Sequence, residues 1–387
     1  MVKTKPVYAF EEADSKKRML LGGKGAGLSE MTRLKLPVPP GFTITTEVCN
    51  KYYDNNKKLP KDLMPAVMKN IIKMEKKTGK KWNSTTNPLL VSVRSGAAIS
   101  MPGMMDTILN LGLNEKTVEG FAEQTKNPRF SWDSYRRFIQ LFGKVVFGVN
   151  DEKFDHVLDT AKNAQGVTDD SKLDVESLKT IVSEYKKICE THTKRKFPDS
   201  PKEQLELSIE AVFKSWMGER AIVYREKNGI TKDIANGTAV NVVTMVFGNM
   251  GDDSATGVVF TRNGHNGKKE LEGEYLINAQ GEDVVAGVRT GQNIELLKKD
   301  MPKSYKELYN ACSKLEKHYK EPQDIEFTVE QGKFYLLQTR TAKMSAGALV
   351  KTSVDMVKEK LINKDKALLR IPAQQLEALL HRTMDES

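Results

Sequence analysis

The sequence predicts an α+β protein of two or three domains. Stretches with strand-like alternation and glycine-containing turns occur before residue 113 and again after residue 238. Between them, from about residue 115 to residue 197, apolar residues recur at helical spacing on a polar background. A chain of 387 residues also exceeds what one ordinary core accommodates.

The net charge of +10 is compatible with a nucleic acid, an anionic surface or a phosphorylated ligand. The lysines gather in local clusters such as residues 69–81, with acids between them. These clusters lack the alternation of basic and aromatic residues that RNA readers show. We therefore predict a solvated basic surface and no nucleic-acid partner.

The composition predicts a cytoplasmic protein without a membrane partner. No apolar run approaches the length of a membrane span, and the N-terminus lacks the apolar core of a signal peptide. The three cysteines, Cys49, Cys189 and Cys312, are scattered, which indicates a reducing compartment rather than a disulfide framework or a zinc site.

A glycine-rich turn, LGGKGAGL at residues 21–28, precedes an apolar pattern at helical spacing. Backbone N–H groups at a helix N-terminus attract phosphate, and glycines let a phosphate approach. Lys24 lies in this turn, although the spacing is neither Walker A nor G-x-G-x-x-G. A plain turn with a surface lysine remains the alternative.

Residues 37–45 predict a turn leading into a strand, and Leu89–Arg94 predict a second strand. Ser92 and Arg94 would share one face of that strand. Arg94 suits a phosphate clamp, and pairing with an acid is the alternative. The loop at residues 101–106 carries methionines that we expect to be exposed.

Long helices are expected in residues 115–197, and another is expected over residues 200–229, broken near Gly218. The helical stretch contains nothing that resembles a reactive centre, and His156 and His192 are expected at the surface or at an interface.

Residues 239–262 form a strand–turn–strand pattern, which could cover the phosphates of a nucleotide or be a plain hairpin. Another strand leads to Gln280 and Glu282, and a helix is expected from Pro302 to Tyr319. Beyond Thr341 the pattern is helical.

Residues 324–340 predict a β-hairpin. Alternation puts Asp324 and Glu326 on one face, and a three-residue loop would set Glu326 opposite Gln338 and Asp324 opposite Arg340. Carboxylate and amide oxygens suit Mg²⁺, and the arginine suits a phosphate. A two-residue loop would separate Glu326 from Gln338, and an edge hairpin with a solvated polar face is the alternative.

Six segments in family order resemble the nucleotide-binding portion of the pyruvate, phosphate dikinase family. They are LGGKGAGL, VPPGFTIT, SVRSGAAISMPGMMDTILNLGL, TMVFGNMGDDSATGVVFTRN, GEYLINAQGEDVVAG and IEFTVEQGKFYLLQTR. The resemblance implies an ATP-grasp fold in two α/β halves with an inserted helical subdomain. The implied boundaries are 1–112 with 198–240 and 241–342 for the halves, 113–197 for the insertion and 343–387 for a linker.

The resemblance also implies roles for the residues selected above. Lys24 and Arg94 would bind ATP phosphates, and Arg340 would join them in the catalytic set. Glu326 and Gln338 would hold Mg²⁺, and Asp324 would complete the site. Gln280 and Glu282 would lie near the adenosine.

In the family, a histidine on a separate domain attacks the β-phosphate of ATP and expels AMP, after which inorganic phosphate and pyruvate each accept a phosphoryl group. None of the histidines, including His265, His318 and His381, has a phosphohistidine context. We therefore expect this chain to be a fragment without the phosphohistidine and pyruvate-binding domains. We expect the fragment to be monomeric and its full-length parent to be a homodimer. Targeting of that full-length parent to an organelle is the alternative to a cytoplasmic location.

The alternatives are a fragment of a pyruvate, water dikinase and a nucleotide-binding module without chemistry of its own.

Overall fold

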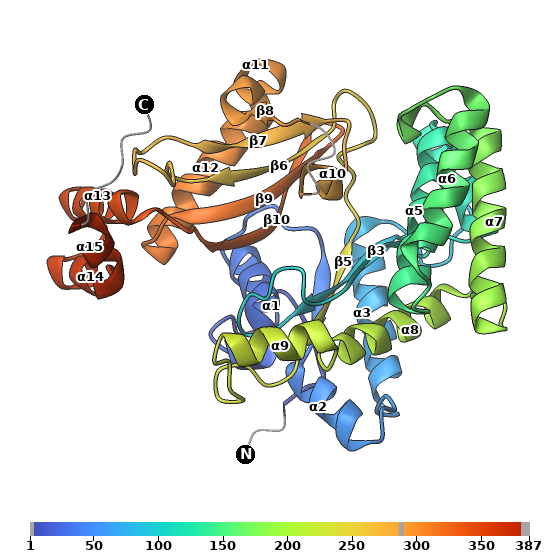
Figure 1. Cartoon of the computed structure of the whole chain (residues 1–387), viewed down its shortest axis with the longest axis horizontal. Helices are drawn as coiled ribbons and strands as arrows, with labels where there is room; N and C mark the ends of the chain where they lie inside the picture. The colour runs from blue at the N-terminus through green and yellow to red at the C-terminus, as the bar shows by residue number, and fades with distance from the viewer. Residues whose placement is uncertain (1–3, 286–289, 381–387) are drawn as a thin grey trace. The chain divides into compact units, whose positions relative to one another are not determined.

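The computed structural model describes residues 4–285 and 290–380. The chain divides into two compact units, Met1–Leu34 with Pro39–Met245 (unit 1) and Lys35–Val38 with Val246–Ser387 (unit 2). Each unit contains one five-stranded sheet and several helices (Figure 1). This combination confirms the α+β class.

The sheet of unit 1 is antiparallel throughout, in the order β1-β2-β5-β3-β4. Its strands are β1 (Val7–Ala9), β2 (Gly41–Ile44), β5 (Ala239–Thr244), β3 (Val91–Gly96) and β4 (Thr107–Leu111). All six residues of β5 are buried, as expected for a central strand of small and β-branched residues.

The helices of unit 1 fall into two groups. Those near the sheet strands in sequence are α1 (Arg18–Arg33), α2 (Thr46–Asp54), α3 (Leu63–Thr78), α8 (Pro201–Ser215) and α9 (Glu219–Lys227). The break between α8 and α9 confirms the interruption predicted near Gly218. The inserted group, α4 (Glu115–Thr125), α5 (Pro128–Val145), α6 (Asp151–Gln165) and α7 (Val175–Thr193), confirms the helices predicted for residues 115–197. A short 3₁₀ turn, η1, spans Asp170–Lys172.

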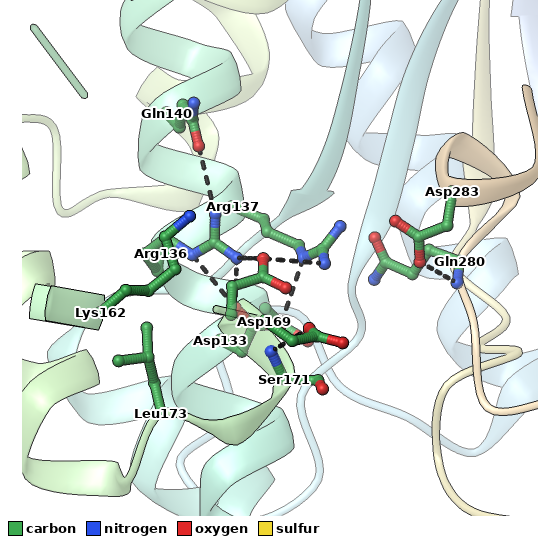
Figure 2. A network of polar contacts seen from close by, with 12 residues as sticks. Asp133, Arg136, Arg137, Gln140, Lys162, Asp169, Ser171, Leu173, Gln280 and Asp283 are labelled. Carbon is green, nitrogen blue, oxygen red and sulfur yellow. Dashed lines mark hydrogen bonds and ion pairs between the residues drawn. The ribbon is translucent and has the colours of Figure 1, made fainter. Parts of the chain in front are cut away.

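A buried charge network ties this inserted group together (Figure 2). Arg136 donates to Asp133 on the same helix and to Asp170 in η1, 2.9 Å away, while Arg137 donates to the other oxygen of Asp133 at 3.2 Å. Burial opposes ionisation of Asp133, but the two arginines prevail and lower its pKa to about 2. The network joins the 3₁₀ turn to α5.

The sheet of unit 2 is also antiparallel, in the order β10-β9-β6-β7-β8. Its strands are β10 (Lys333–Thr341), β9 (Gln323–Glu330), β6 (Ala255–Phe260), β7 (Glu272–Ile277) and β8 (Gln292–Asn293). Helix α12 (Pro302–Tyr319), which has the predicted bounds, packs on β9 and β10 (Figure 1). The remaining short helices are α10 (Gly281–Val285), η2 (Ile294–Leu296) and α11 (Leu297–Asp300).

The predicted strand–turn–strand at residues 239–262 is not a hairpin. β5 belongs to the sheet of unit 1 and β6 to the sheet of unit 2, so the segment between them connects the units rather than closing a turn. The predicted boundary at 240/241 accordingly falls inside β5, whereas the compact units divide after Met245.

The C-terminal part of unit 2 is helical, as predicted. It comprises α13 (Ala346–Lys358), α14 (Lys364–Leu369) and α15 (Ala373–Leu380), with a small core formed by Met356, Ile362 and Ala367.

One expectation about exposure is wrong. Met101 is only 5 % exposed, because the loop that carries it turns this side chain inward, while Met104 and Met105 are half-buried.

Candidate functional site

The hairpin of β9 and β10 has the register that the sequence predicts at its polar end. Gln338 is paired with Glu326, and Arg340 with Asp324. Ile325, Phe327 and Val329 are fully buried, which confirms the apolar face of β9. The two acids, the amide and the guanidinium therefore project from neighbouring positions of one sheet face.

The three-residue loop from which this register was predicted is wrong. Lys333 pairs with Glu330, so the loop has two residues, Gln331 and Gly332, both with positive φ (47° and 71°) as in a type I′ turn. A bulge at Leu337 then adds one residue to β10 and shifts the register. The bulge restores the pairing that a two-residue loop alone would have lost.

Asp324 is a buried carboxylate that is only half satisfied. Its side chain is 8 % exposed, and Oδ2 accepts a 2.6 Å hydrogen bond from Nε of Arg340. Oδ1 is buried and has no hydrogen-bond partner among the described residues. Burial raises the pKa of Asp324, and the neighbouring Glu326 adds to the rise, while Arg340 opposes it. With two carboxylates and one guanidinium, the cluster of Asp324, Glu326 and Arg340 has an excess of negative charge.

A divalent cation bound beside these carboxylates would offset their negative charge. The described part of the chain contains no group of three or more His, Cys, Asp or Glu side chains placed to hold a metal ion. Mg²⁺ needs fewer protein ligands than that, because it commonly takes one or two carboxylates and completes its shell with water and substrate phosphates. Glu326 and the amide oxygen of Gln338 are suited to this role, with Asp324 beside them.

The raised pKa of Asp324 predicts how stability depends on pH. Because its pKa is higher in the folded than in the unfolded chain, ionised Asp324 lowers the free energy of unfolding at neutral pH, and this penalty disappears as pH falls through the folded pKa. Asp324→Asn cannot titrate. We expect wild type to gain stability relative to this variant between pH 7 and about pH 4, measured by urea unfolding. A wild-type stability that stays constant or falls relative to the variant over this pH range would contradict the assignment.

Gln280 is another buried polar group of unit 2 without a side-chain partner among the described residues. It is 5 % exposed, and neither Oε1 nor Nε2 has a hydrogen-bond partner among the described residues. Its backbone N–H donates to the Asp283 carboxylate at 2.9 Å, which fixes the start of α10 (Figure 2). Glu282 lies in α10, but its side chain is outside the described residues.

The glycine-containing segment before β6 is anchored to the hairpin tip. The N–H of Phe247 donates to Glu330 at 2.7 Å, and the N–H of Gly332 donates to the carbonyl of Asp253 at 2.8 Å. A Cβ on Gly248 would approach the carbonyl oxygen of Ala279 to 2.5 Å, so this backbone packs closely against the end of β7. The segment is held at both ends.

In unit 1 the glycine-rich turn lies against the end of β3. Gly22 interrupts α1 with φ 69° and ψ 167°, a conformation open essentially to glycine alone. The N–H of Gly23 donates to the carbonyl of Ala97 at 2.8 Å. Lys24 then lies next to Gly96, since a Cβ on Gly96 would be 3.4 Å from that of Lys24.

Arg94 shares a face of β3 with Gly96, because the two residues are two positions apart. Its Nε donates to the hydroxyl of Ser92 at 3.2 Å, which confirms that Ser92 and Arg94 lie on one face. The structure therefore brings Lys24 and Arg94 to the same end of β3.

The close packing of Gly22 predicts a large loss of stability on substitution. A Cβ at Gly22 would lie 1.8 Å from the carbonyl oxygen of Gly96, in addition to the backbone strain. We expect Gly22→Ala to lower the free energy of unfolding by about 3 kcal/mol or more, measured with urea. The matched control is Gly79→Ala, where φ is also positive (71°) but nothing lies within 4 Å, and a loss of about 1 kcal/mol is expected. Equal losses would refute the close-packing argument.

Some buried polar residues of unit 1 were not selected from the sequence. Asn241 of β5 is paired with Arg94 in the sheet, and its Nδ2 is buried without a partner among the described residues. Asp133 and Arg136 could have been found from their spacing of three on a helix. His156 and His192, which were predicted at the surface or an interface, are exposed, as are His265 and His318, and His381 lies outside the described residues.

Comparison with known proteins assigns the family. The profile of the family described as "Pyruvate phosphate dikinase, AMP/ATP-binding domain" matches residues 18–61, 55–306 and 301–361. The chain belongs to the pyruvate, phosphate dikinase family. It is 54 % identical over 380 residues to pyruvate, phosphate dikinase of Entamoeba histolytica and 51 % identical over 380 residues to that of Clostridium symbiosum, and each match covers 98 % of this chain.

The family resemblance covers less than half of these relatives. The chain spans 43 % of the length of the Entamoeba and Clostridium enzymes and 39 % of pyruvate, phosphate dikinase 1, chloroplastic, of Arabidopsis thaliana, to which it is 48 % identical. In the part of the chain that the structure describes, no helix combines the length and apolarity needed to cross a membrane.

Proposed function

We propose that this chain binds MgATP through an ATP-grasp-type fold and presents it for phosphoryl transfer as the nucleotide-binding part of a pyruvate, phosphate dikinase. The observation that supports this most directly is the buried Asp324 carboxylate with one unsatisfied oxygen, next to Glu326, Gln338 and Arg340. Such a cluster is costly unless a cation enters it.

The proposed roles follow the chemistry of each side chain. Glu326 and Gln338 hold Mg²⁺ through oxygen atoms, and Asp324 orients Arg340 by the 2.6 Å hydrogen bond. By the family resemblance, Lys24, Arg94 and Arg340 bind the phosphates of ATP. The metal, when bound, neutralises charge on the phosphate oxygens. Gln280, with its unsatisfied amide, and Glu282 bind the adenosine part.

In the proposed reaction, a histidine on a separate domain attacks the β-phosphate of ATP. The bond from the β-phosphate to the bridging oxygen of the α-phosphate breaks, and AMP leaves with that oxygen. The histidine then carries a pyrophosphoryl group, whose terminal phosphoryl group passes to inorganic phosphate. The residues of this chain position and neutralise the triphosphate, which is the main requirement of phosphoryl transfer. Pyruvate accepts the remaining phosphoryl group elsewhere.

Calorimetric titration of the chain with MgATP, and with ATP in the presence of a metal chelator, tests the proposal. We expect binding in both titrations and much tighter binding with the metal. Absence of MgATP binding, or affinity that does not depend on the metal, would overturn the assignment.

The second candidate function is a nucleotide-binding module without chemistry of its own. The exposed histidines, none of which has an assigned role in the site, favour it for the chain in isolation. The names of the relatives favour a phosphate dikinase over a pyruvate, water dikinase. By the same resemblance we propose a monomer for this chain and a homodimer for the full-length protein, and sedimentation equilibrium distinguishes the two states.

A further inference from the structure

A fully buried arginine connects the C-terminal helices of unit 2 to its sheet. Arg262 follows β6 and is 0 % exposed. Its Nε and Nη2 donate to the two carboxylate oxygens of Glu316 on α12, at 3.1 and 2.8 Å. Nη2 also donates to Glu359, the residue that ends α13, at 2.9 Å. One guanidinium therefore joins the sheet, α12 and the C-terminal helices.

The same network continues to the base of the hairpin. Glu316 also accepts a 2.9 Å hydrogen bond from the hydroxyl of Thr261, and that hydroxyl accepts from the N–H of Gln323 at 2.9 Å. The side-chain oxygen of Gln323 accepts from the hydroxyl of Thr339 at 2.9 Å. Gln323 and Thr339 directly precede the two residues that form the charge pair of the candidate site, Asp324 and Arg340.

The C-terminal helices contact this end of the sheet at further points. The N–H of Ser345, before α13, donates to the carbonyl of Gly264 at 2.9 Å, and a guanidinium nitrogen of Arg370 donates to the carbonyl of Lys320, in the loop that leads into β9. A Cβ on Gly267 would lie 2.8 Å from the carbonyl oxygen of Ala348. The C-terminal helices are thus held on the connection between β6 and β7 and on the loop before β9.

Charge balance makes Glu359 important to the network. A buried guanidinium is stabilised only when carboxylates compensate the loss of its hydration. Glu316 supplies one negative charge and Glu359 the second, and Lys269 also donates to Glu359, at 2.7 Å. Without the Glu359 charge, the buried Arg262 would keep only Glu316 as a carboxylate partner among the described residues, and the position of Glu316 would be less well defined.

We propose that Arg262 and Glu359 are positioning residues, through which the docking of the C-terminal helices (residues 346–369) sets the affinity of the hairpin for MgATP. The inference rests on the proposed function, since it assigns a control to the same site. When the helices are docked, the hydrogen-bond chain holds Gln323 and Thr339 in place, so that Asp324 and Arg340 meet the metal–phosphate complex in one geometry. When the helices are released, Gln323 and Thr339 are no longer held, and Asp324 and Arg340 lose their fixed geometry.

The test is Glu359→Gln, measured by calorimetry with MgATP and separately with adenosine. The matched control is Asp355→Asn, because Asp355 lies on the same helix with the same 26 % side-chain exposure but pairs with Lys351 of its own helix. We expect Glu359→Gln to weaken MgATP about fivefold or more and to leave adenosine unchanged. Asp355→Asn should change neither affinity.

Arg262→Lys gives a second variant, since an ammonium keeps the charge but cannot bridge two carboxylates in the planar geometry of a guanidinium. It should weaken MgATP as Glu359→Gln does. If wild type binds MgATP and both variants bind it equally well, the coupling does not exist. The same holds if both variants lose MgATP and adenosine in equal proportion, which indicates a structural role alone. If wild type binds no MgATP, the proposed function itself fails.

Discussion

Arg340→Ala weakens the binding of MgATP about ten- to hundredfold and leaves the binding of adenosine unchanged. This is the result we expect from calorimetry, because a charge-assisted contact of this kind contributes about 1.5–3 kcal/mol. Two effects act in the same direction. The phosphates lose a partner, and the buried Asp324 loses the guanidinium that donates to it at 2.6 Å.

The matched control for Arg340→Ala is Lys333→Ala. Lys333 lies on the same strand and its removal changes the net charge equally, but it is at the turn end of β10, where it pairs with Glu330. We expect this variant to alter the affinity for MgATP by less than about twofold, as an exposed charge should. Equal losses for MgATP and adenosine in Arg340→Ala would instead assign Arg340 a structural role.

The second large effect concerns transfer to a histidine. Incubated alone with MgATP, the chain should bind the nucleotide and form no AMP above background hydrolysis, because no histidine is assigned to its site. ATP labelled at the β-phosphate should transfer label to the phosphohistidine domain that the family resemblance implies, added as a separate protein. Transfer should be inefficient, since a tether normally supplies effective concentrations in about the millimolar range.

Arg94→Ala should reduce this transfer by about a thousandfold or more, because an arginine that stabilises the transferring phosphoryl group commonly contributes that much. Arg33→Ala is the control, since its side chain is 63 % exposed and pairs with Glu30 on its own helix. Rapid AMP formation by the chain alone, or label on one of its own histidines, would refute the assignment of a separate nucleophile.

Local patterns predicted those parts of the structure that local physics determines. Alternation along Asp324–Val329 was sufficient to define both faces of β9, because strand side chains alternate whatever the turn does. The bounds of α12 followed from Pro302 at its first position and from the apolar spacing after it. The break between α8 and α9 was predictable because glycine, here Gly218, disfavours the interior of a helix.

What failed depended on contacts between distant segments. β5 and β6 are neighbours in sequence, and sequential strands usually pair, yet the two lie in different sheets because each finds its partners elsewhere in the chain. The bulge at Leu337 had no signature, since Leu336 and Leu337 are both apolar and either could face the core. The network of Arg262, Glu316 and Glu359 joins residues from three separate regions, so no local spacing could reveal it.

The bulge at Leu337 restricts which insertions and deletions this hairpin can accept during evolution. The turn is one residue shorter than the polar cluster requires, and the bulge supplies that residue within β10. A single insertion in the turn or a single deletion near Leu337 would exchange the faces of Gln338 and Glu326 relative to each other. Changes of length are therefore tolerated only as compensating pairs, and descendants that lose the bulge must lengthen the turn by one residue to keep a working site.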